Sequence, residues 1–149
     1  MAEAIKTRRG KSKGALTLPL YTEGAENVVW VNGFSYLSTT RTKEAGDLKI
    51  SVSGGTGHFV TDATVDLTPF TKLYVDYDAV GSGNVYAGFM VSSEKLTEQQ
   101  DASYGTTVAA ARSTKSIDIS SINSSKYIKL YCGNSSGTVY ARFYKIWLE

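Results

Sequence analysis

The residues best suited to acid–base or metal chemistry are few in this chain of 149 residues. It has one histidine, His58, and one cysteine, Cys132. A zinc site normally needs four ligands, so these two residues cannot form one. The Gly-x-Ser-x-Gly match at residues 133–137 falls in a predicted turn between two strands and not between a strand and a helix, so it is not a nucleophile turn. No nucleophile is therefore paired with His58, which we expect at the surface or in a turn. Cys132 follows Ile128 and Leu130 at a spacing of two residues, which places it on the same strand face, and it is predicted to be a small buried hydrophobic residue.

Two carboxylates form the one metal candidate. Asp76 and Asp78 share a face of a predicted strand, where their oxygens could bind Ca²⁺. The alternative is a solvated strand face near Lys72. A carboxylate pair could also hydrolyse a glycosidic bond, but nothing in this short chain indicates the deep cleft that would raise one carboxyl pKa. We therefore predict no catalytic residues, no cofactor and no enzymatic activity.

Tyrosines are a richer source of binding chemistry, with ten in the chain. Several fall on the strand face opposite the apolar residues. Such tyrosines can stack on sugar rings, pack against another subunit, or cover the sheet surface, and all three interpretations stay open. The residues predicted to contact a sugar or a subunit are Tyr74, Tyr86, Tyr127, Tyr131, Tyr140 and Tyr144.

Strands must position these side chains, because the hydrophobic pattern from residue 27 onward has a period of two. The alternating residues include Leu48, Ile50 and Val52, then Leu73, Val75 and Tyr77, then Val85, Ala87, Phe89 and Val91, and finally Ile117 and Ile119. Glycine-rich segments at 53–57, 81–84 and 133–137 are predicted to be turns between them. Residues 93–100 are interpreted as a loop or one short turn. Residues 139–148 are apolar on both faces, as in a last strand that is buried on both sides, either in the centre of a sheet or under the arm.

Charge separates the chain into two regions. The net charge is +2, but the first 20 residues carry five basic side chains and one acidic. We predict an extended basic arm at 1–26 and a β-sandwich domain at 27–149. Pro19 favours an edge strand or a surface strap for the end of the arm. The arm residues predicted to bind a partner are Ile5, Lys6, Arg8, Arg9, Lys11, Lys13, Leu18 and Leu20.

The arm does not favour nucleic-acid binding, because no aromatic residues are interleaved with its charges and the remainder of the chain is slightly acidic. No apolar run follows the basic start, so no signal peptide is predicted. No run is long enough for a membrane-spanning helix, and no membrane partner is predicted. The expected location is the host cytoplasm during synthesis and a particle afterwards.

Four segments resemble a known family. Residues 66–76 (DLTPFTKLYVD), 116–122 (SIDISSI), 127–131 (YIKLY) and 139–148 (VYARFYKIWL) are similar to strands of jelly-roll sandwiches related to carbohydrate-binding modules. The resemblance covers roughly residues 27–149 and implies an all-β, antiparallel jelly-roll-like β-sandwich. Such sandwiches recur in virion proteins of tailed phages. Residues 5–10 (IKTRRG) resemble the opening of phage tail-fibre proteins, which implies an anchoring role.

The resulting hypothesis is a structural virion protein of a tailed phage. Its arm would attach it to capsid, tail or baseplate subunits, it would be a homo-oligomer in the assembly, and the sandwich would project outward. The first alternative is a carbohydrate-binding module that recognises a host cell-wall glycan. The second is a capsid decoration protein that cements head subunits. The sequence does not separate head from tail location.

Overall fold

The structure is a computed structural model that describes residues 17–149. It is all-β in this range, with no helix and therefore none that could cross a membrane. The nine strands of the described residues are β1 (Leu18–Thr22), β2 (Ala25–Glu26), β3 (Trp30–Lys43), β4 (Leu48–Thr61), β5 (Val65–Asp66), β6 (Lys72–Ser92), β7 (Ala102–Asp118), β8 (Ser125–Gly133) and β9 (Thr138–Leu148).

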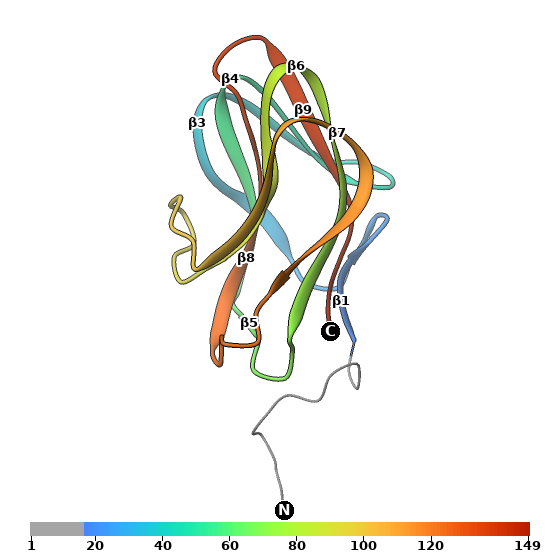
Figure 1. Cartoon of the computed structure of the whole chain (residues 1–149), viewed down its shortest axis with the longest axis vertical. Helices are drawn as coiled ribbons and strands as arrows, with labels where there is room; N and C mark the ends of the chain where they lie inside the picture. Colours follow the sequence, from blue (N-terminus) through green and yellow to red (C-terminus); the bar gives the residue numbers. More distant parts are fainter. Residues whose placement is uncertain (1–16) are drawn as a thin grey trace, which may run out of the picture.

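Two layers arise because four long strands bend and pair in both of them (Figure 1). The front sheet contains, in spatial order, residues 30–36, 56–61, 127–133, 86–92 and 102–108. The back sheet contains residues 38–43, 48–53, 138–148, 72–80 and 110–118, with β1 beside the end of β9. Every pairing is antiparallel. The predicted jelly-roll-like β-sandwich is confirmed.

Glycines make the bends, and here the sequence prediction was wrong in detail. Segments 53–57 and 81–84 do not end strands but lie inside β4 and β6. Gly54 and Gly83 both have φ of +73°, a conformation that glycine adopts without steric cost. The chain therefore turns from one layer to the other and continues. The runs predicted as separate strands at 73–77 and 85–91 are two halves of β6.

The core lies between the layers and contains the alternating residues predicted from the sequence. Tyr77 links the layers: its ring stacks on Phe143 at 5.4 Å between centroids, and its hydroxyl donates to the Ala87 carbonyl at 3.2 Å. Cys132 is fully buried, as predicted, and burial raises the pKa of its thiol to about 12. The described structure therefore gives this thiol no reactive character.

β9 is flanked by β6 on one side and by β4 and β1 on the other, which confirms the predicted central strand. The predicted domain boundary follows residue 26, and in the structure residues 18–22 already pair with β9 and with residues 25–26 in the back sheet. Leu20 is fully buried in the core, and its carbonyl accepts a hydrogen bond from the Trp30 indole at 3.3 Å. Leu18 is partly exposed. The other predicted arm residues, 5–13, lie outside the described residues.

A pair of truncations tests this boundary. A chain lacking residues 1–20 is expected to be less stable than one lacking 1–16 by about 3 kcal/mol or more, because it loses a buried leucine and leaves the Trp30 N–H without its acceptor. Urea denaturation of both chains measures the difference. Equal unfolding free energies would show that β1 contributes nothing to the sandwich.

Candidate functional site

A row of four residues crosses the outer face of the front sheet. Tyr36 pairs with Thr56, Thr56 with Gly133, and Gly133 with Tyr86. Directly paired residues point to the same face of a sheet. One tyrosine therefore stands at each end of the row, with a threonine and a glycine, which have small side chains or none, between them. Strands lie about 4.8 Å apart, which separates the tyrosines by roughly 14 Å. The row is therefore a trough with aromatic walls.

A third tyrosine lies in the next row, where His58 pairs with Tyr131, Tyr131 with Gly88, and Gly88 with Gly105. A Cβ atom added at Gly105 would lie 1.9 Å from the Tyr131 hydroxyl oxygen. The Tyr131 ring therefore extends across two neighbouring strands, over a glycine in each. Gly105 leaves room for the hydroxyl end of the ring, so the ring can lie along the sheet, whereas a Cβ atom at Gly88 would meet the backbone of Tyr104.

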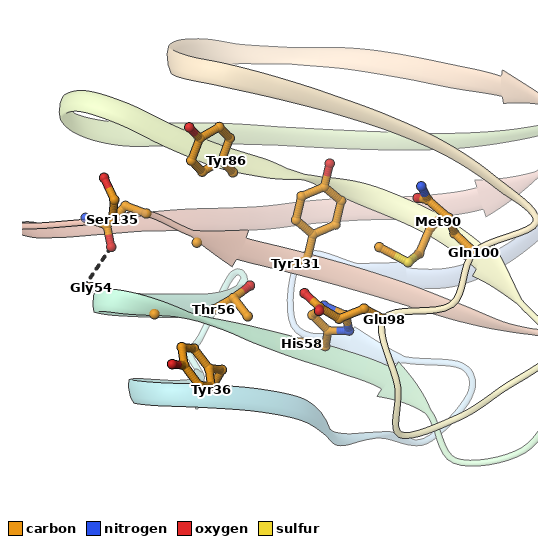
Figure 2. Close-up of a pocket in the computed structure, with 13 residues that line it drawn as sticks. Tyr36, Gly54, Thr56, His58, Tyr86, Met90, Glu98, Gln100, Tyr131 and Ser135 are labelled. Atoms are coloured by element: carbon orange, nitrogen blue, oxygen red, sulfur yellow. Dashed lines mark hydrogen bonds between the residues drawn. The ribbon is translucent and has the colours of Figure 1, made fainter.

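Together these rows form a groove of about 610 Å³. Figure 2 shows Tyr36 and Tyr86 on opposite sides, with Tyr131 between them in projection and Glu98 and Gln100 on the loop after β6. Tyr36 and Tyr86 are the most open aromatic walls, with exposed fractions of 60% and 41%. The described residues that line the groove are Tyr36, Gly54, Gly55, Thr56, His58, Tyr86, Met90, Glu98, Gln100, Tyr131, Gly133, Asn134 and Ser135.

Gly105 offers a test of the Tyr131 position. We expect Gly105→Ala to displace the ring and to weaken ligand binding about tenfold, because the new methyl group overlaps the hydroxyl. Adding Tyr131→Phe removes that oxygen and leaves the nearest ring carbon at 3.2 Å, so part of the binding should return. Gly46→Ala is the control, since nothing lies within 4 Å of its Cβ position. A Gly105→Ala variant that binds normally would contradict this role for the glycine.

His58 is not at the surface or in a turn as predicted, but in β4 with an exposed fraction of 2%. Its ring lies 5.4 Å from Phe34 and 6.1 Å from Tyr131, and its Nδ1 atom has no hydrogen-bond partner. Burial, followed by the charges of Lys129 and Arg41, lowers the pKa of the imidazole to about 4. At neutral pH His58 is therefore an uncharged part of the groove floor.

A buried lysine holds the loop at residues 93–101 over one end of the sheet. Lys129, on central strand β8, has no exposed surface, and its amine donates to the carbonyls of Thr97 at 2.6 Å and Gln99 at 3.3 Å. Burial lowers the pKa of this amine. An unpaired buried ammonium would be costly, so the loop carbonyls stabilise the lysine while the lysine positions the loop.

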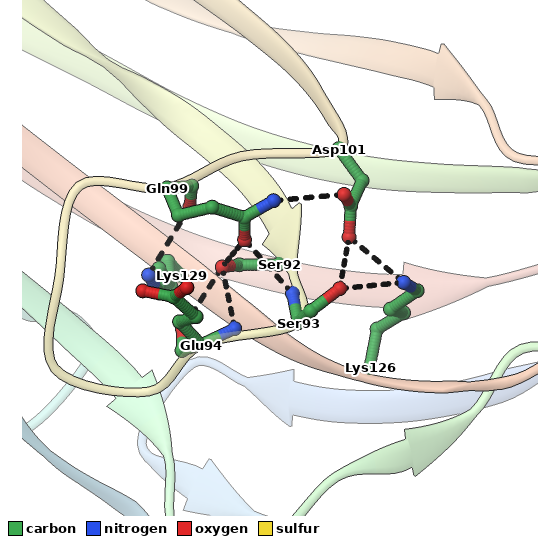
Figure 3. Close-up of polar contacts among 7 residues, drawn as sticks. All are labelled: Ser92, Ser93, Glu94, Gln99, Asp101, Lys126 and Lys129. Atoms are coloured by element: carbon green, nitrogen blue, oxygen red, sulfur yellow. Dashed lines mark hydrogen bonds and ion pairs between the residues drawn. The ribbon is translucent and has the colours of Figure 1, made fainter.

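Further contacts fix the same loop from its two ends (Figure 3). Ser92 and the backbone N–H of Ser93 both donate to the Gln99 side chain. Asp101 accepts from Ser93 at 2.8 Å and forms an ion pair with Lys126 at 2.9 Å, which lowers the pKa of the Asp101 carboxyl to about 2. These contacts hold the loop that carries Glu98 and Gln100 in place, so that it forms one wall of the groove.

The outer face of the back sheet is a different kind of surface. Arg142 forms an ion pair with Asp78 at 2.7 Å, and Asp78 also accepts from the Tyr144 hydroxyl at 2.8 Å. Asp76 is similarly held by Arg112 at 2.9 Å. Both carboxylates of the calcium candidate are therefore already paired with arginines, and no group of three metal-ligating side chains occurs among residues 17–149.

The six predicted contact tyrosines are therefore divided between the two faces. Tyr86 and Tyr131 line the groove, and Tyr127 lies on the same sheet beyond it. The other three lie on the back sheet: Tyr74 stacks on Trp147 at 5.0 Å, Tyr140 lies under Lys49 at 4.5 Å, and Tyr144 contacts Arg112 at 3.8 Å. The groove residues missed from the sequence include Tyr36, His58, Glu98 and Gln100, because each lies beside a bulge, bend or loop.

Comparison with known proteins shows which solved structures share this fold. No protein family matches the sequence, and no curated protein does. Solved structures do match: a family 11 carbohydrate-binding module from Clostridium thermocellum in complex with a β-1,3-1,4-mixed-linked tetrasaccharide has a TM-score of 0.59 and 20% identity, over 89% of this chain and 94% of that one.

A family 29 module matches with a TM-score of 0.60 and 14% identity, over 91% of this chain and 92% of that one. A low-affinity xylan-binding module of family 86 from Roseburia intestinalis matches with a TM-score of 0.61 and 6% identity, over 90% and 95%. The fold that these comparisons show is the β-sandwich found in carbohydrate-binding modules. Identities this low show the shared fold alone.

Proposed function

We propose that this protein binds an extended glycan, without cleaving it, in the groove of the front sheet. The observation that carries the proposal is the row of Tyr36, Thr56, Gly133 and Tyr86 together with the flat ring of Tyr131. Aromatic faces can stack on the apolar faces of sugar rings, and the small residues between them leave space for the chain. The similarity to carbohydrate-binding modules supports the same function.

The groove chemistry favours binding over hydrolysis. Hydrolysis of a glycosidic bond ordinarily uses two carboxylates on either side of it. Among the described residues that line the groove, Glu98 is the single carboxylate. A binding module needs no second acid, so the residues present suffice for the proposed function.

Affinity gel electrophoresis of the full chain tests the proposal. Mixed-linkage β-glucan, xylan and purified Gram-positive cell walls serve as probes, the walls by pull-down. We expect retardation or capture by at least one probe. Absence of binding to all three would overturn the proposed function.

Attachment to a phage particle is a separate proposal, supported by the resemblance of residues 5–10 to tail-fibre openings. The solved structures that match are carbohydrate-binding modules and lend it no support. Virion partners, oligomerisation in the assembly, capsid decoration and the expected location all stay predictions. Light scattering of the chain with and without residues 1–16 tests whether this segment mediates self-association, and a monomer in both forms would count against it.

A further inference from the structure

A second pocket lies on the back sheet, on the opposite side of the sandwich from the groove. In β9, Lys145 and Trp147 alternate with the buried Ile146 and Leu148, so they point away from the core. Beside them is a pocket of about 320 Å³, here called the β1–β9 pocket. The described residues that line it are Thr17, Pro19, Thr22, Lys145 and Trp147, and none of them lines the groove.

An irregularity in β1 forms one wall of this pocket. Pro19 of β1 pairs with Trp147 of β9, and three residues further along Thr22 pairs with Lys145. In a regular strand, positions three apart point to opposite faces. The register shifts between Pro19 and Tyr21, and the two residues between Pro19 and Thr22 are both buried. Bulges of this kind re-aim side chains, so Pro19 and Thr22 both face outward beside β9.

The Trp147 indole forms the opposite wall. Trp147 pairs with Tyr74 of β6, and their rings stack with planes 6° apart and centroids 5.0 Å apart. The described residues that line the pocket come from β9, from β1 and from the residue before β1, and none comes from β6. One indole face therefore packs on Tyr74, and the other is turned toward β1. The indole N–H donates to the Glu149 carboxylate at 2.9 Å, which holds the ring in this orientation.

An aromatic face bordered by hydroxyl groups and an amine matches a single sugar unit. A pyranose ring has apolar C–H faces that pack on aromatic rings, and its hydroxyl groups need hydrogen-bond partners. The hydroxyls of Thr17 and Thr22 can both donate and accept. The Lys145 amine can donate, because its ion pair with Glu23 is long, at 3.8 Å. The volume is at the lower end of the range for ligand pockets, which suits one unit.

We infer that the β1–β9 pocket is a second glycan site, which binds one pyranose unit by stacking it on Trp147. The site shares no residue with the groove, so it does not depend on the proposed function. One sugar unit makes few contacts, and we expect a Kd on the order of 1 mM. Together with the proposed groove, this pocket lets one molecule hold glycans on two opposite faces.

Tryptophan fluorescence of the full chain tests the inference, because it reports on this pocket. The chain has two tryptophans; Trp30 is fully buried, and none lines the groove. The probes are glucose, xylose and N-acetylglucosamine, and the control solute is sorbitol, an open-chain polyol. We expect at least one of the three sugars to change the emission with saturation and to protect Trp147 from acrylamide quenching. Sorbitol should do neither.

Variants assign the response to the pocket. Thr22→Val keeps a branched side chain and removes the hydroxyl, so it should weaken sugar binding about threefold to tenfold. Thr114→Val is the matched control, because Thr114 pairs with Asp76, and Asp76 with Lys145, in the same row outside the pocket. It should leave the affinity unchanged. Trp147→Phe should remove the response, since Trp30 is inaccessible.

Several results would overturn the inference: no saturable response to any of the three sugars, an equal response to sorbitol, or the same affinity in Thr22→Val as in the parent. Stronger acrylamide quenching of a sugar-free chain that lacks residues 1–16 would also overturn it, because that segment would then be the occupant. Binding of mixed-linkage β-glucan or xylan without a tryptophan response would leave the proposed groove function intact. A response that persists when both Tyr36 and Tyr86 are replaced by alanine would support the pocket whatever the groove binds.

Discussion

Simultaneous replacement of Tyr36 and Tyr86 by alanine is expected to weaken glycan binding more than a hundredfold while the fold persists. The two rings are the exposed walls of the groove, and aromatic residues at the centre of a contact each commonly contribute about 2 kcal/mol or more. Two such losses together correspond to at least a factor of a hundred. Because the rings lie outside the core, the free energy of unfolding should change by less than about 1 kcal/mol.

Affinity electrophoresis with the best probe measures this effect, and urea denaturation checks the fold. Tyr127→Ala is the control, since Tyr127 lies on the same sheet face outside the groove and its loss should not change binding. Each single variant should show an intermediate effect. If the double variant binds within threefold of the parent, the groove is not the glycan site.

Alternating apolar residues were sufficient to predict the sandwich. Side chains such as Leu73, Val75 and Ile50 alternate with polar ones because one face of each strand meets the core, and that period is visible in the sequence. The bends were not predictable in the same way. A glycine with positive φ can end a strand or redirect it, and Gly54 and Gly83 redirect it. The residues around a glycine that ends a strand and around one that redirects it are of the same types, so the sequence does not distinguish the two.

The groove depends on those bends. Tyr36 precedes Leu37, a non-glycine residue at φ of +62°, and this strained position at a break in the β3–β4 register sets the face on which Tyr36 points. No sequence pattern specifies that register. Tyr86 and Tyr131 were predictable as tyrosines on the outer face of a strand. Their proximity to Tyr36 was not, because it depends on the pairing of strands that are far apart in the chain.

The position of His58 was predicted wrongly because residues 53–57 were assigned to a turn. Its neighbours Gly54, Gly55 and Gly57 favoured a loop, so a surface histidine was the natural prediction. Gly57 is in fact a strand residue, and a Cβ at that position would lie 2.1 Å from a methyl group of Thr39. The glycine is required for close packing between β3 and β4, and it carries the following histidine into a buried position.

That buried position predicts a stability that depends strongly on pH. The pKa of His58 is about 4 in the folded protein and 6.5 when exposed, so the unfolded chain binds a proton between these values and the folded chain does not. Protonation therefore favours unfolding: the stabilisation is fully present above about pH 6.5 and is lost as the pH falls toward 4. A difference of this size corresponds to about 3 kcal/mol.

Urea denaturation at several pH values between about 7 and 4 measures this loss, and His58→Gln should remove most of it. Asp101 acts in the same sense as His58 near the lower limit, because its carboxyl pKa is about 2 in the folded protein and 3.8 when exposed, and this effect is present in both chains. Burial raises the carboxyl pKa of Asp47, which acts in the opposite sense near the lower limit and is present in both chains. The difference between parent and variant therefore isolates the histidine.

A direct titration keeps the prediction testable if His58→Gln does not fold. His58 is the single histidine of the chain, so its imidazole C–H resonance in the parent protein is unambiguous. An NMR titration of the folded protein should give a midpoint near pH 4, because Lys129 and Arg41 oppose a second positive charge at a site with an unpartnered Nδ1. A midpoint near 6.5 would mean that the imidazole reaches solvent, and the groove floor would then carry a positive charge in mildly acidic conditions.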